Sequence, residues 1–456
     1  MTPFVLPSHY TSGMIFQRNM PIRIEGTASE PCTITLQLAE DSTTQYFTPG
    51  KVSMILPARS ASRDLTLKIT VKTETEETVT SFTDIYVGEI WIAGGQSNMA
   101  WPLNDTDEYR DSLEIVENSD VRFFTVGRVD KTKGLNQTPE PDLGWQGCTG
   151  ESALEFSAVA YHFARIIYEE MRIPIGIINC NFGGSSILAW LSKEYTKNEF
   201  FITPEWEGFI HHVPSGLYDT MLSKIVNFPC RGMLWYQGET EGFDSRASYY
   251  GQAQEALLNM MKYHQKNPEF AFHYVQIAPW ENPQAVTWAD ICNAQRQFHI
   301  DNPECALITI GDVGGDEDIH PPRKLQVGER LAYAAMNITY GLDSMKFTGP
   351  IATKATKVGR EIRVDFTHAT AMYVRGEIGS FQLLYDDPAG GIEYIDVVNP
   401  VVRDCAVYLP LPKEEVPPYV RDKALLMVQY EYVSNYKVGL KNSAGFPASL
   451  FKLLID

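Results

Sequence analysis

The first part of the chain alternates between apolar and polar side chains in short runs. Ile34, Leu36 and Leu38 are separated by Thr and Gln, and the run Leu65–Val71 repeats the pattern with Thr and Lys. A period of two over such short runs, bounded by Pro, Gly, Asp and Ser clusters, is typical of half-buried antiparallel strands. We therefore predict an N-terminal β domain over residues 1–85.

The middle of the chain predicts helices that alternate with apolar strands. Apolar residues on one face predict a helix around Val159–Ile167, which must end before Pro174 and is followed by the strand Ile175–Cys180. Similar patterns predict helices over 247–265 and 288–300, strands over 270–277 and 306–310, and a helix that begins near Lys324. Alternation at this spacing favours βαβ units around a parallel sheet.

Alternation with a period of two returns after about residue 342. Ile362, Val364 and Phe366 alternate with charged residues, and Leu425–Tyr432 is a further candidate strand. A length of 456 residues fits about three domains of roughly 150 residues each. We predict an N-terminal β domain at 1–85, an α/β domain at 86–342 and a C-terminal β domain at 343–456.

The hydrophobic content and the net charge of the chain limit the kinds of molecule it is expected to bind. Hydrophobic residues make up 44% of the chain, enough for a packed core, and the net charge is −19 with no Lys/Arg run. Nucleic acid and anionic membranes are therefore not expected as partners, because both attract basic surfaces. No apolar stretch reaches the roughly 18 residues of a spanning helix. The oligomeric state is not indicated.

Cysteine usage and the N-terminus bear on the compartment. The chain has seven Cys, an odd number without CxxC pairing, which favours buried reduced thiols in a cytoplasmic protein. The N-terminus lacks the basic start and apolar core of a signal peptide. A secreted protein whose signal peptide has been removed stays an alternative.

The most informative segment is an apolar strand that runs into Gly94-Gly95-Gln96-Ser97-Asn98. In a parallel α/β sheet, groups at the carboxyl end of a strand face the crevice where ligands bind. A glycine pair permits a tight turn there and leaves the Ser97 hydroxyl at the start of a helix, whose N–H groups suit an oxyanion. A plain Ser N-cap is the structural alternative.

Two further strands end in polar glycine turns. Asn179–Ser185 contains the pair Gly183-Gly184, and Met233–Thr240 runs from apolar residues into Gln237 and Gly238. A backbone amide at Gly184 and the side-chain amide of Gln237 are candidate donors to a developing oxyanion.

The candidate general base is His320, in the loop 311–322 after the strand 306–310. Carboxylates at Asp318 and Glu317, two and three residues before it, suit the third role in a Ser-His-acid triad. Residues two apart point to the same side of an extended loop, so we favour Asp318 over Glu317. Support from a backbone carbonyl instead stays open. The adjacent His211 and His212 are expected to be loop residues.

The same loop permits a metal site as the rival interpretation. Asp312, Asp316, Glu317, Asp318 and His320 carry suitable ligand atoms, but the EF-hand pattern of acidic residues around a Gly is absent. We predict a metal-independent reaction with no cofactor.

Together these segments resemble the sialate O-acetylesterase family, which are carbohydrate acetylesterases of the SGNH type. Four ordered blocks carry the resemblance, and both chain ends add to it: Gly95–Met99, Gly183–Trp190, Trp235–Glu239, Asp318–Lys324, the "GMVLQR"-like Gly13–Arg18 and the "GLPA"-like Gly445–Ala448. The similarity covers nearly the whole chain. It departs from the family pattern at Glu317, where these enzymes often have Asp, and at Ser185 and Leu188, where they often have Thr and Glu.

The resemblance implies a flavodoxin-like SGNH hydrolase domain with a parallel sheet, flanked by N- and C-terminal β domains. It places the nucleophile on Ser97 and the base on His320, and oxyanion or substrate contacts on Gln96, Asn98, Gly184, Gln237 and Glu239. The implied reaction removes an acetyl group from an O-acetylated sugar through an acetyl-enzyme. A xylan or hemicellulose acetylesterase, or a non-catalytic carbohydrate-binding protein, are the alternatives.

Overall fold

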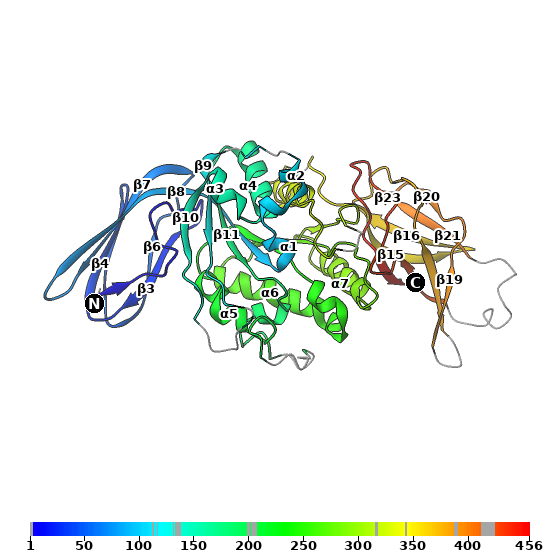
Figure 1. Ribbon diagram of the computed structural model, residues 1–456, viewed down its shortest axis with the longest axis horizontal. Coiled ribbons are helices and arrows are strands. Elements are labelled where there is room, and N and C mark those ends of the chain that lie inside the picture. Colours follow the sequence, from blue (N-terminus) through cyan, green and yellow to red (C-terminus); the bar gives the residue numbers. More distant parts are fainter. Residues whose placement is uncertain are drawn as a thin grey trace. The chain divides into compact units, whose positions relative to one another are not determined.

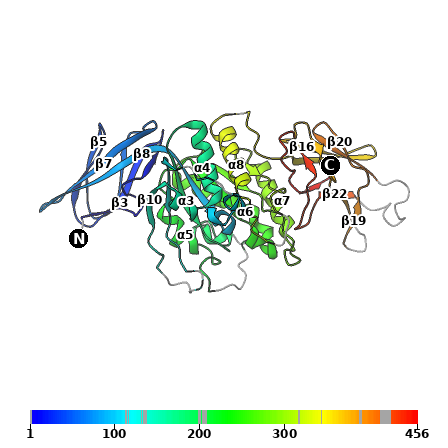
Figure 2. The same cartoon turned by 45° about the horizontal axis from the view of Figure 1, so that its top comes forward.

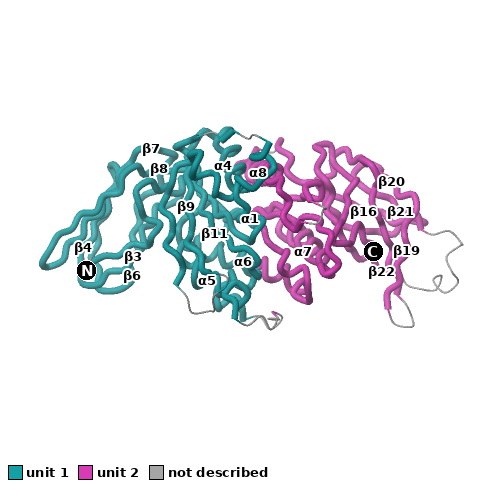
Figure 3. Tube along the Cα trace, in the orientation of Figure 1, with its two compact units in different colours: residues 1–198, 203–235, 256–272 teal, residues 199–202, 236–255, 273–456 magenta. Residues whose placement is uncertain are grey.

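The computed structural model describes residues 3–456 except 112–113, 116, 131, 133–137, 198–200, 202–207, 315–317, 343, 387–390 and 412–424. The chain divides into two compact units, coloured separately in Figure 3. Unit 1 comprises residues 1–198, 203–235 and 256–272, and unit 2 comprises residues 199–202, 236–255 and 273–456. Each unit is described below by itself.

Unit 1 begins with an all-β region (Figure 1). Its strands are β1 (Phe4–Val5), β2 (Ile15–Gln17), β3 (Ile22–Ala28), β4 (Cys32–Leu38), β5 (Asp41–Phe47), β6 (Gly50–Leu56), β7 (Ser62–Lys72) and β8 (Glu77–Gly95). The predicted alternation in β4 is confirmed, because Ile34, Leu36 and Leu38 are buried and the residues between them are more exposed. Strands β1, β3 and β6 form one sheet, and β4 pairs with β5 and β7. Figure 2 shows this region in a second view.

Strand β8 joins this region to an α/β region. Its first part pairs antiparallel with β7, from Glu77 onward. Its last part, from Glu89 to Gly95, pairs parallel with β11 (Ile175–Asn181). The strand therefore passes residue 85 without a break, and the three-domain division stays a prediction.

The α/β sheet of unit 1 has the strand order β10-β9-β11-β8-β12. Its other strands are β9 (Asn118–Thr125), β10 (Leu143–Cys148) and β12 (Gly232–Tyr236). β11 is parallel to β9 and β8, whereas β10 is antiparallel to β9, so the sheet is mixed. β11 is buried along its whole length, as expected for a strand covered on both faces.

The helices of unit 1 are mostly short. They are α1 (Ser97–Ala100), α2 (Asp107–Arg110), α3 (Gly150–Leu154), α4 (Ala158–Met171) and α5 (Gly216–Thr220), with single 3-10 turns at Leu103–Asp105, Ile187–Trp190 and Leu222–Lys224. The predicted helix before Pro174 is α4, which packs against β9 and β11. It ends where Arg172 adopts a left-handed φ of 55°.

Further helices and a short strand lie wholly in unit 2. They are α7 (Trp288–Asp301), α8 (Leu325–Ala334), 3-10 turns at Glu239–Phe243 and Ser245–Tyr249, a π turn at Ala335–Thr339, and strand β14 (Leu307–Ile308). Helix α6 (Tyr250–Gln265) and strand β13 (Ala271–Val275) belong partly to each unit, and β13 pairs parallel with β14. These elements confirm the predicted helix–strand alternation.

The C-terminal part of unit 2 is again all β. Its strands are β15 (Ile351–Val358), β16 (Glu361–Thr367), β17 (Tyr373–Val374), β18 (Phe381–Asp386), β19 (Ile392–Asp396), β20 (Val401–Arg403), β21 (Ala406–Pro410), β22 (Leu425–Tyr430), β23 (Leu440–Lys441) and β24 (Phe451–Leu454). The predicted alternation in β16 is confirmed, and Ile362, Val364 and Phe366 enter one apolar core with residues of β18 and β22.

The chain thus has mixed α/β sheet structure with additional β regions before and after it in the sequence. All seven cysteines are free thiols; six are buried and Cys405 is exposed. Among the helices that the structure describes, none is both long and apolar enough to span a membrane.

Candidate active site

Ser97 lies two residues after the end of strand β8, at the first residue of the one-turn helix α1. The two glycines before it serve different purposes. Gly95 has a φ of 128°, which favours glycine, and allows the chain to leave the strand. A Cβ on Gly94 would lie 3.0 Å from Met233 Cε and 3.1 Å from the Trp235 ring, so Gly94 makes room for side chains of β12.

The turn after β11 lies against Ser97. Asn181 pairs in register with Gly95, and the Phe182 N–H donates to the Gly95 carbonyl at 3.0 Å. A Cβ added to Gly183 would stand 3.4 Å from Ser97 Cβ. Gly184 follows with a left-handed φ of 73°. The structure therefore brings together Ser97 and the Gly183-Gly184 turn, as expected for neighbouring parallel strands.

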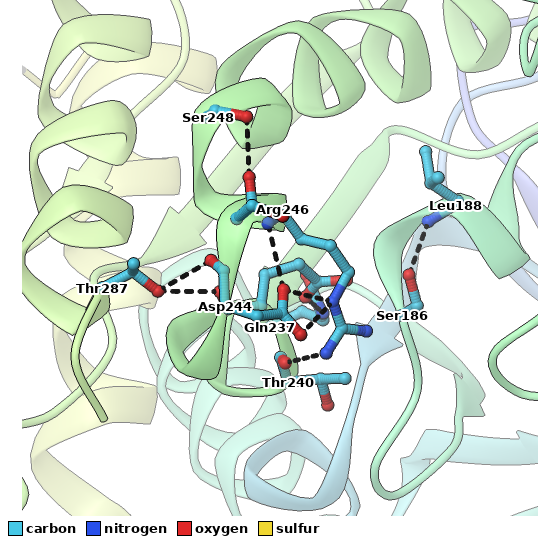
Figure 4. A network of polar contacts seen from close by, with 10 residues as sticks. Ser186, Leu188, Gln237, Thr240, Asp244, Arg246, Ser248 and Thr287 are labelled. Carbon is cyan, nitrogen blue, oxygen red and sulfur yellow. Dashed lines mark hydrogen bonds and ion pairs between the residues drawn. The ribbon is translucent and has the colours of Figure 1, made fainter. Parts of the chain in front are cut away.

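Ser185, where the family often has Thr, has a structural role. It is fully buried, and its hydroxyl accepts a hydrogen bond from Trp190 Nε1 at 3.0 Å. The next residue, Ser186, accepts from the Leu188 N–H at 3.4 Å, which caps the short turn at Ile187–Trp190 (Figure 4). These contacts hold the segment that follows the glycine pair.

A pocket of about 400 Å³ opens beside Ser97 in unit 1. It is lined by Ser97, Ala100, Trp101, Pro102, Arg128, Val129, Phe182 and Gly183. Gln96 and Asn98, which flank Ser97 in sequence, are buried. Arg128 is the charged residue of this lining, and its guanidinium donates to Asn181 Oδ1 at 2.5 Å.

Sequence reasoning missed Arg128 and the aromatic wall of this pocket. Arg128 lies three residues after the end of β9, which is a parallel neighbour of β11. The sequence indicated it only as a polar residue near the end of a strand.

His211 was expected to be a loop residue. Its ring is buried, 5.2 Å from the Phe182 ring, and approaches within 4.0 Å of where a Cβ on Gly184 would stand.

Gln237, the first residue after β12, lies in unit 2 and is fully buried. Its Nε2 donates to Glu241 Oε2 at 2.6 Å, and its carbonyl accepts from the Tyr250 hydroxyl at 2.8 Å and from Gln295 Nε2 at 3.1 Å. Gly238 has a φ of 139°, and a Cβ there would lie 2.9 Å from Ile291 Cγ2. Both the backbone and the amide of Gln237 are therefore held in one orientation.

The 3-10 turns after Gln237 are held by a buried arginine (Figure 4). Arg246 donates to the Asp244 carboxylate at 2.8 Å and to the Thr240 carbonyl at 2.8 Å. Thr287 adds a bond from its hydroxyl to the Asp244 carbonyl at 3.0 Å. This network fixes the segment that follows the predicted oxyanion donor.

Glu239 is buried in the same unit. Burial and the nearby Glu239 carboxylate both raise the pKa of the Tyr236 hydroxyl, so Tyr236 stays protonated at neutral pH. The buried ammonium of Lys324 lies over the Tyr236 ring, 5.6 Å from its centroid. The Tyr236 ring thus receives a cation–π contact from Lys324.

His320 and Asp318 contact each other in unit 2. His320 Nδ1 lies 3.2 Å from Asp318 Oδ1, and the same oxygen accepts the His320 backbone N–H at 2.8 Å. Burial lowers the pKa of His320, and Lys324 acts in the same direction, whereas Asp318 opposes both. The imidazole is therefore largely neutral at pH 7, as a general base must be. Glu317 lies outside the described residues.

The acidic loop offers little to a cation where the structure describes it. Asp312 receives two hydrogen bonds of 2.8 Å from the Arg330 guanidinium. Within the described ranges, no three His, Cys, Asp or Glu side chains are grouped to hold a metal ion. Asp316, like Glu317, lies outside those ranges.

The predicted residues thus gather in two groups. Ser97, Gln96, Asn98 and Gly184 belong to unit 1, and Gln237, Glu239, Asp318 and His320 belong to unit 2. The pairing of the two groups into one catalytic centre stays a prediction.

Comparison with known proteins agrees with the motifs. Residues 87–337 match the model of a family described as carbohydrate esterase, sialic acid-specific acetylesterase. The mouse sialate O-acetylesterase is 25% identical over 326 residues, which cover 59% of this chain and 60% of the mouse protein. The human sialate O-acetylesterase is 24% identical over 325 residues, covering 64% of this chain and 61% of the human protein. The matched region therefore spans less than two thirds of these relatives.

A solved structure covers more of the chain. A carbohydrate acetylesterase from Xanthomonas citri superimposes with a TM-score of 0.83 at 26% identity, over 98% of this chain and 99% of that protein. The family match extends over more than half of the chain, and the resemblance predicted from the motifs is confirmed. The chain belongs to the carbohydrate esterase family of sialic acid-specific acetylesterases.

Proposed function

We propose that the chain is a serine esterase that removes O-acetyl groups from carbohydrates, with an O-acetylated sialic acid as substrate. The observation that carries the proposal is the position of Ser97. It stands at the carboxyl end of a buried parallel strand, on the wall of a 400 Å³ pocket and against the Gly183-Gly184 turn. Such a crevice is where ligands bind in open α/β sheets.

In the proposed first half-reaction, Ser97 Oγ attacks the carbonyl carbon of the acetyl ester and its proton passes to His320 Nε2. The negative charge on the carbonyl oxygen is stabilised by the N–H groups of Ser97 and Gly184 and by the Gln237 amide. The bond to the sugar oxygen then breaks, and that oxygen takes the proton from His320. An acetyl group remains on Ser97.

In the second half-reaction, His320 accepts a proton from water, and the hydroxide attacks the acetyl-enzyme. Acetate leaves, and Ser97 recovers its proton from His320. The contact of Nδ1 with Asp318 supports this role, since a carboxylate there fixes the tautomer with a basic Nε2 and stabilises the imidazolium. The hydrogen bond from Gln237 to Glu241 supports a fixed amide donor.

The finer fold assignment is part of the proposal. We assign residues 86–342 to a flavodoxin-like SGNH hydrolase domain. The parallel register of β11 with β8 and β9 supports this assignment, as does the position of Ser97 two residues after the end of β8.

A xylan or hemicellulose acetylesterase is the second candidate. The structure from Xanthomonas citri, which covers nearly the whole chain, is named as a carbohydrate acetylesterase without mention of sialic acid. The same chemistry at Ser97 serves both substrates. A non-catalytic carbohydrate-binding protein would need neither a serine in the pocket nor a neutral histidine.

Replacement of Ser97 by Ala tests the proposal. We expect kcat for 4-nitrophenyl acetate to fall by about 10⁶, as for other serine nucleophiles. Ser223→Ala is the matched control, since that serine is exposed and donates only to the Asp219 carbonyl. More than a few per cent residual activity in a folded Ser97→Ala enzyme would exclude Ser97 as the nucleophile. Acetate release from O-acetylated sialic acids and from acetylated xylo-oligosaccharides then separates the two substrate classes.

A further inference from the structure

A second, larger pocket of about 850 Å³ lies wholly within unit 2. Three segments line it: residues 311–314, which begin the loop that carries His320, residues 375–380 between β17 and β18, and residues 431–439 between β22 and β23. Loops held by a rigid scaffold commonly carry binding sites. We propose that this pocket is a subsite for an acidic sugar unit of a glycan, and the choice of a sugar rests on the proposed function.

The walls of this pocket are fixed against one another. A Cβ on Gly439 would lie 1.6 Å from the Glu377 carbonyl oxygen, and the Arg375 N–H donates to the Gly439 carbonyl at 2.9 Å. A Cβ on Gly311 would lie 3.0 Å from the Tyr436 ring, whose hydroxyl bonds the Ile277 carbonyl at 2.7 Å. The pocket is therefore formed before any ligand binds, which lowers the entropic cost of binding.

Two of the carboxylates in the lining are already satisfied. Asp312 is held by both terminal nitrogens of the Arg330 guanidinium. Glu431 accepts the backbone N–H groups of Ser380 at 2.5 Å and Lys437 at 2.8 Å. Asp312 is thereby neutralised, whereas Glu431 keeps its negative charge although backbone N–H groups satisfy its oxygens.

The cations of the lining are available instead. Arg375 and Lys437 form no ion pair within the described part of the chain, and the remaining carboxylate, Glu377, is exposed. Two carboxylates of the lining, Glu377 and Glu431, form no ion pair among the described residues either, so it is the free arginine fork and ammonium, and not the net charge of the lining, that would bind an anionic ligand. A carboxylate accepts well from an arginine fork and a lysine.

Hydroxyl-binding groups lie in the same lining. Asn435 Oδ1 is buried and accepts no hydrogen bond among the described residues, while its Nδ2 donates to Glu281 at 3.2 Å. The Ser380 hydroxyl and apolar Ile378 and Val438 complete a mixed surface. An acidic sugar carries hydroxyls and a carboxylate on a partly apolar ring, so it matches these lining groups. The volume of the pocket accommodates one or two sugar units.

Paired probes with and without a carboxylate test this subsite. Saturation-transfer NMR titrations of the full chain would use methyl β-glucuronide and methyl β-glucoside. We expect the glucuronide to bind the wild type, and the Arg375→Ala/Lys437→Ala double variant and Lys437→Glu to weaken it by about tenfold or more, the loss typical of charge-assisted contacts. Arg360→Ala is the matched control, because Arg360 is exposed in the same β region outside the pocket.

The outcomes separate this inference from the proposed esterase. Equal glucuronide affinity in the wild type and the double variant, no glucuronide binding, or equally tight glucoside binding would each overturn the acidic-sugar subsite. Hydrolysis of 4-nitrophenyl acetate should be unchanged in the double variant and in Arg360→Ala. If the wild type binds glucuronide through Arg375 and Lys437 but hydrolyses no acetyl ester, the proposed esterase function is wrong and the proposed subsite is retained.

Discussion

Asp318 and His320 are two residues apart in an extended loop, close enough for one carboxylate oxygen to contact both the main chain and the ring of the histidine. Asp318 Oδ1 accepts both the backbone N–H and the Nδ1–H of His320, an Asx-type arrangement that fixes the ring as well as the main chain. The side chain of Asp318 is 68% exposed, so solvent screens much of its attraction for the imidazolium. We therefore assign to the Asp318 carboxylate chiefly the tautomer of His320 with a basic Nε2, which an amide in its place would not fix.

Replacement of Asp318 by Asn tests that assignment. We expect kcat to fall a hundredfold or more at neutral pH, up to the roughly 10⁴ seen for the equivalent change in a serine protease. Because the Asp318 carboxylate raises the pKa of His320, its loss should move the acid limb of kcat/KM to lower pH. In the wild type that limb should already lie below the ordinary imidazole value of about 6.5. Glu317→Gln is the comparison: a crippled Glu317→Gln enzyme beside a near-normal Asp318→Asn enzyme would contradict the choice.

Strand ends are the elements that carry the candidate chemistry. β8, β11 and β12 each run into a turn with a glycine of positive φ, namely Gly95, Gly184 and Gly238. Glycine is required at these places because other residues adopt such φ values only at a cost. Each turn follows a stretch of its strand whose residues are buried.

Gly183 shows how closely two such turns approach. We expect Gly183→Ala to fold normally and to lower kcat/KM about tenfold, because the new methyl would stand 3.4 Å from Ser97 Cβ, on the pocket wall, where small misplacements are costly. Gly147→Ala is the control, since nothing lies within 4 Å of its added Cβ. Thermal unfolding and ester hydrolysis would be compared for both variants. Unchanged hydrolysis by Gly183→Ala would show that this turn is remote from the reacting ester.

At the scale of the whole molecule, buried histidines couple stability to pH. Burial lowers the pKa of His9 to about 4, of His368 to about 4 and of His162 to about 3. The unfolded chain binds protons on these residues below about pH 6.5, where the folded chain does not. Stability from these groups is therefore complete above pH 6.5 and is lost as the pH falls towards 4.

We expect the Tm to fall by several degrees between pH 7 and pH 5, before most carboxylates titrate. Replacement of His162 by a neutral residue of similar size, His162→Gln, should make the Tm less dependent on pH across this interval, since one proton uptake on unfolding is removed. His264→Gln, at a half-exposed helix position, is the comparison and should flatten the profile less. A wild-type Tm that stays constant from pH 7 to pH 5 would contradict the argument.

Local periodicity determined most of the elements. The period-two runs at β4, β7 and β16 and the helices α4, α7 and α8 depend on side chains a few residues apart, so they can be read from the sequence. The extent of β8 cannot, because its antiparallel and parallel partners are set by segments far away in the chain. The strand consequently passes the point where a domain boundary was predicted.

The same distinction applies to the candidate site. Ser97, Gly184, Gln237 and His320 stand in motifs whose residue types and local turns reveal their chemistry, and the contact between Asp318 and His320 is local. Arg128 beside Asn181, the Gln295 partner of Gln237 and the pocket with Arg375 and Lys437 were decided by tertiary structure alone. Each depends on segments distant in sequence that pack together, and packing between such segments follows from the whole core rather than from any short pattern.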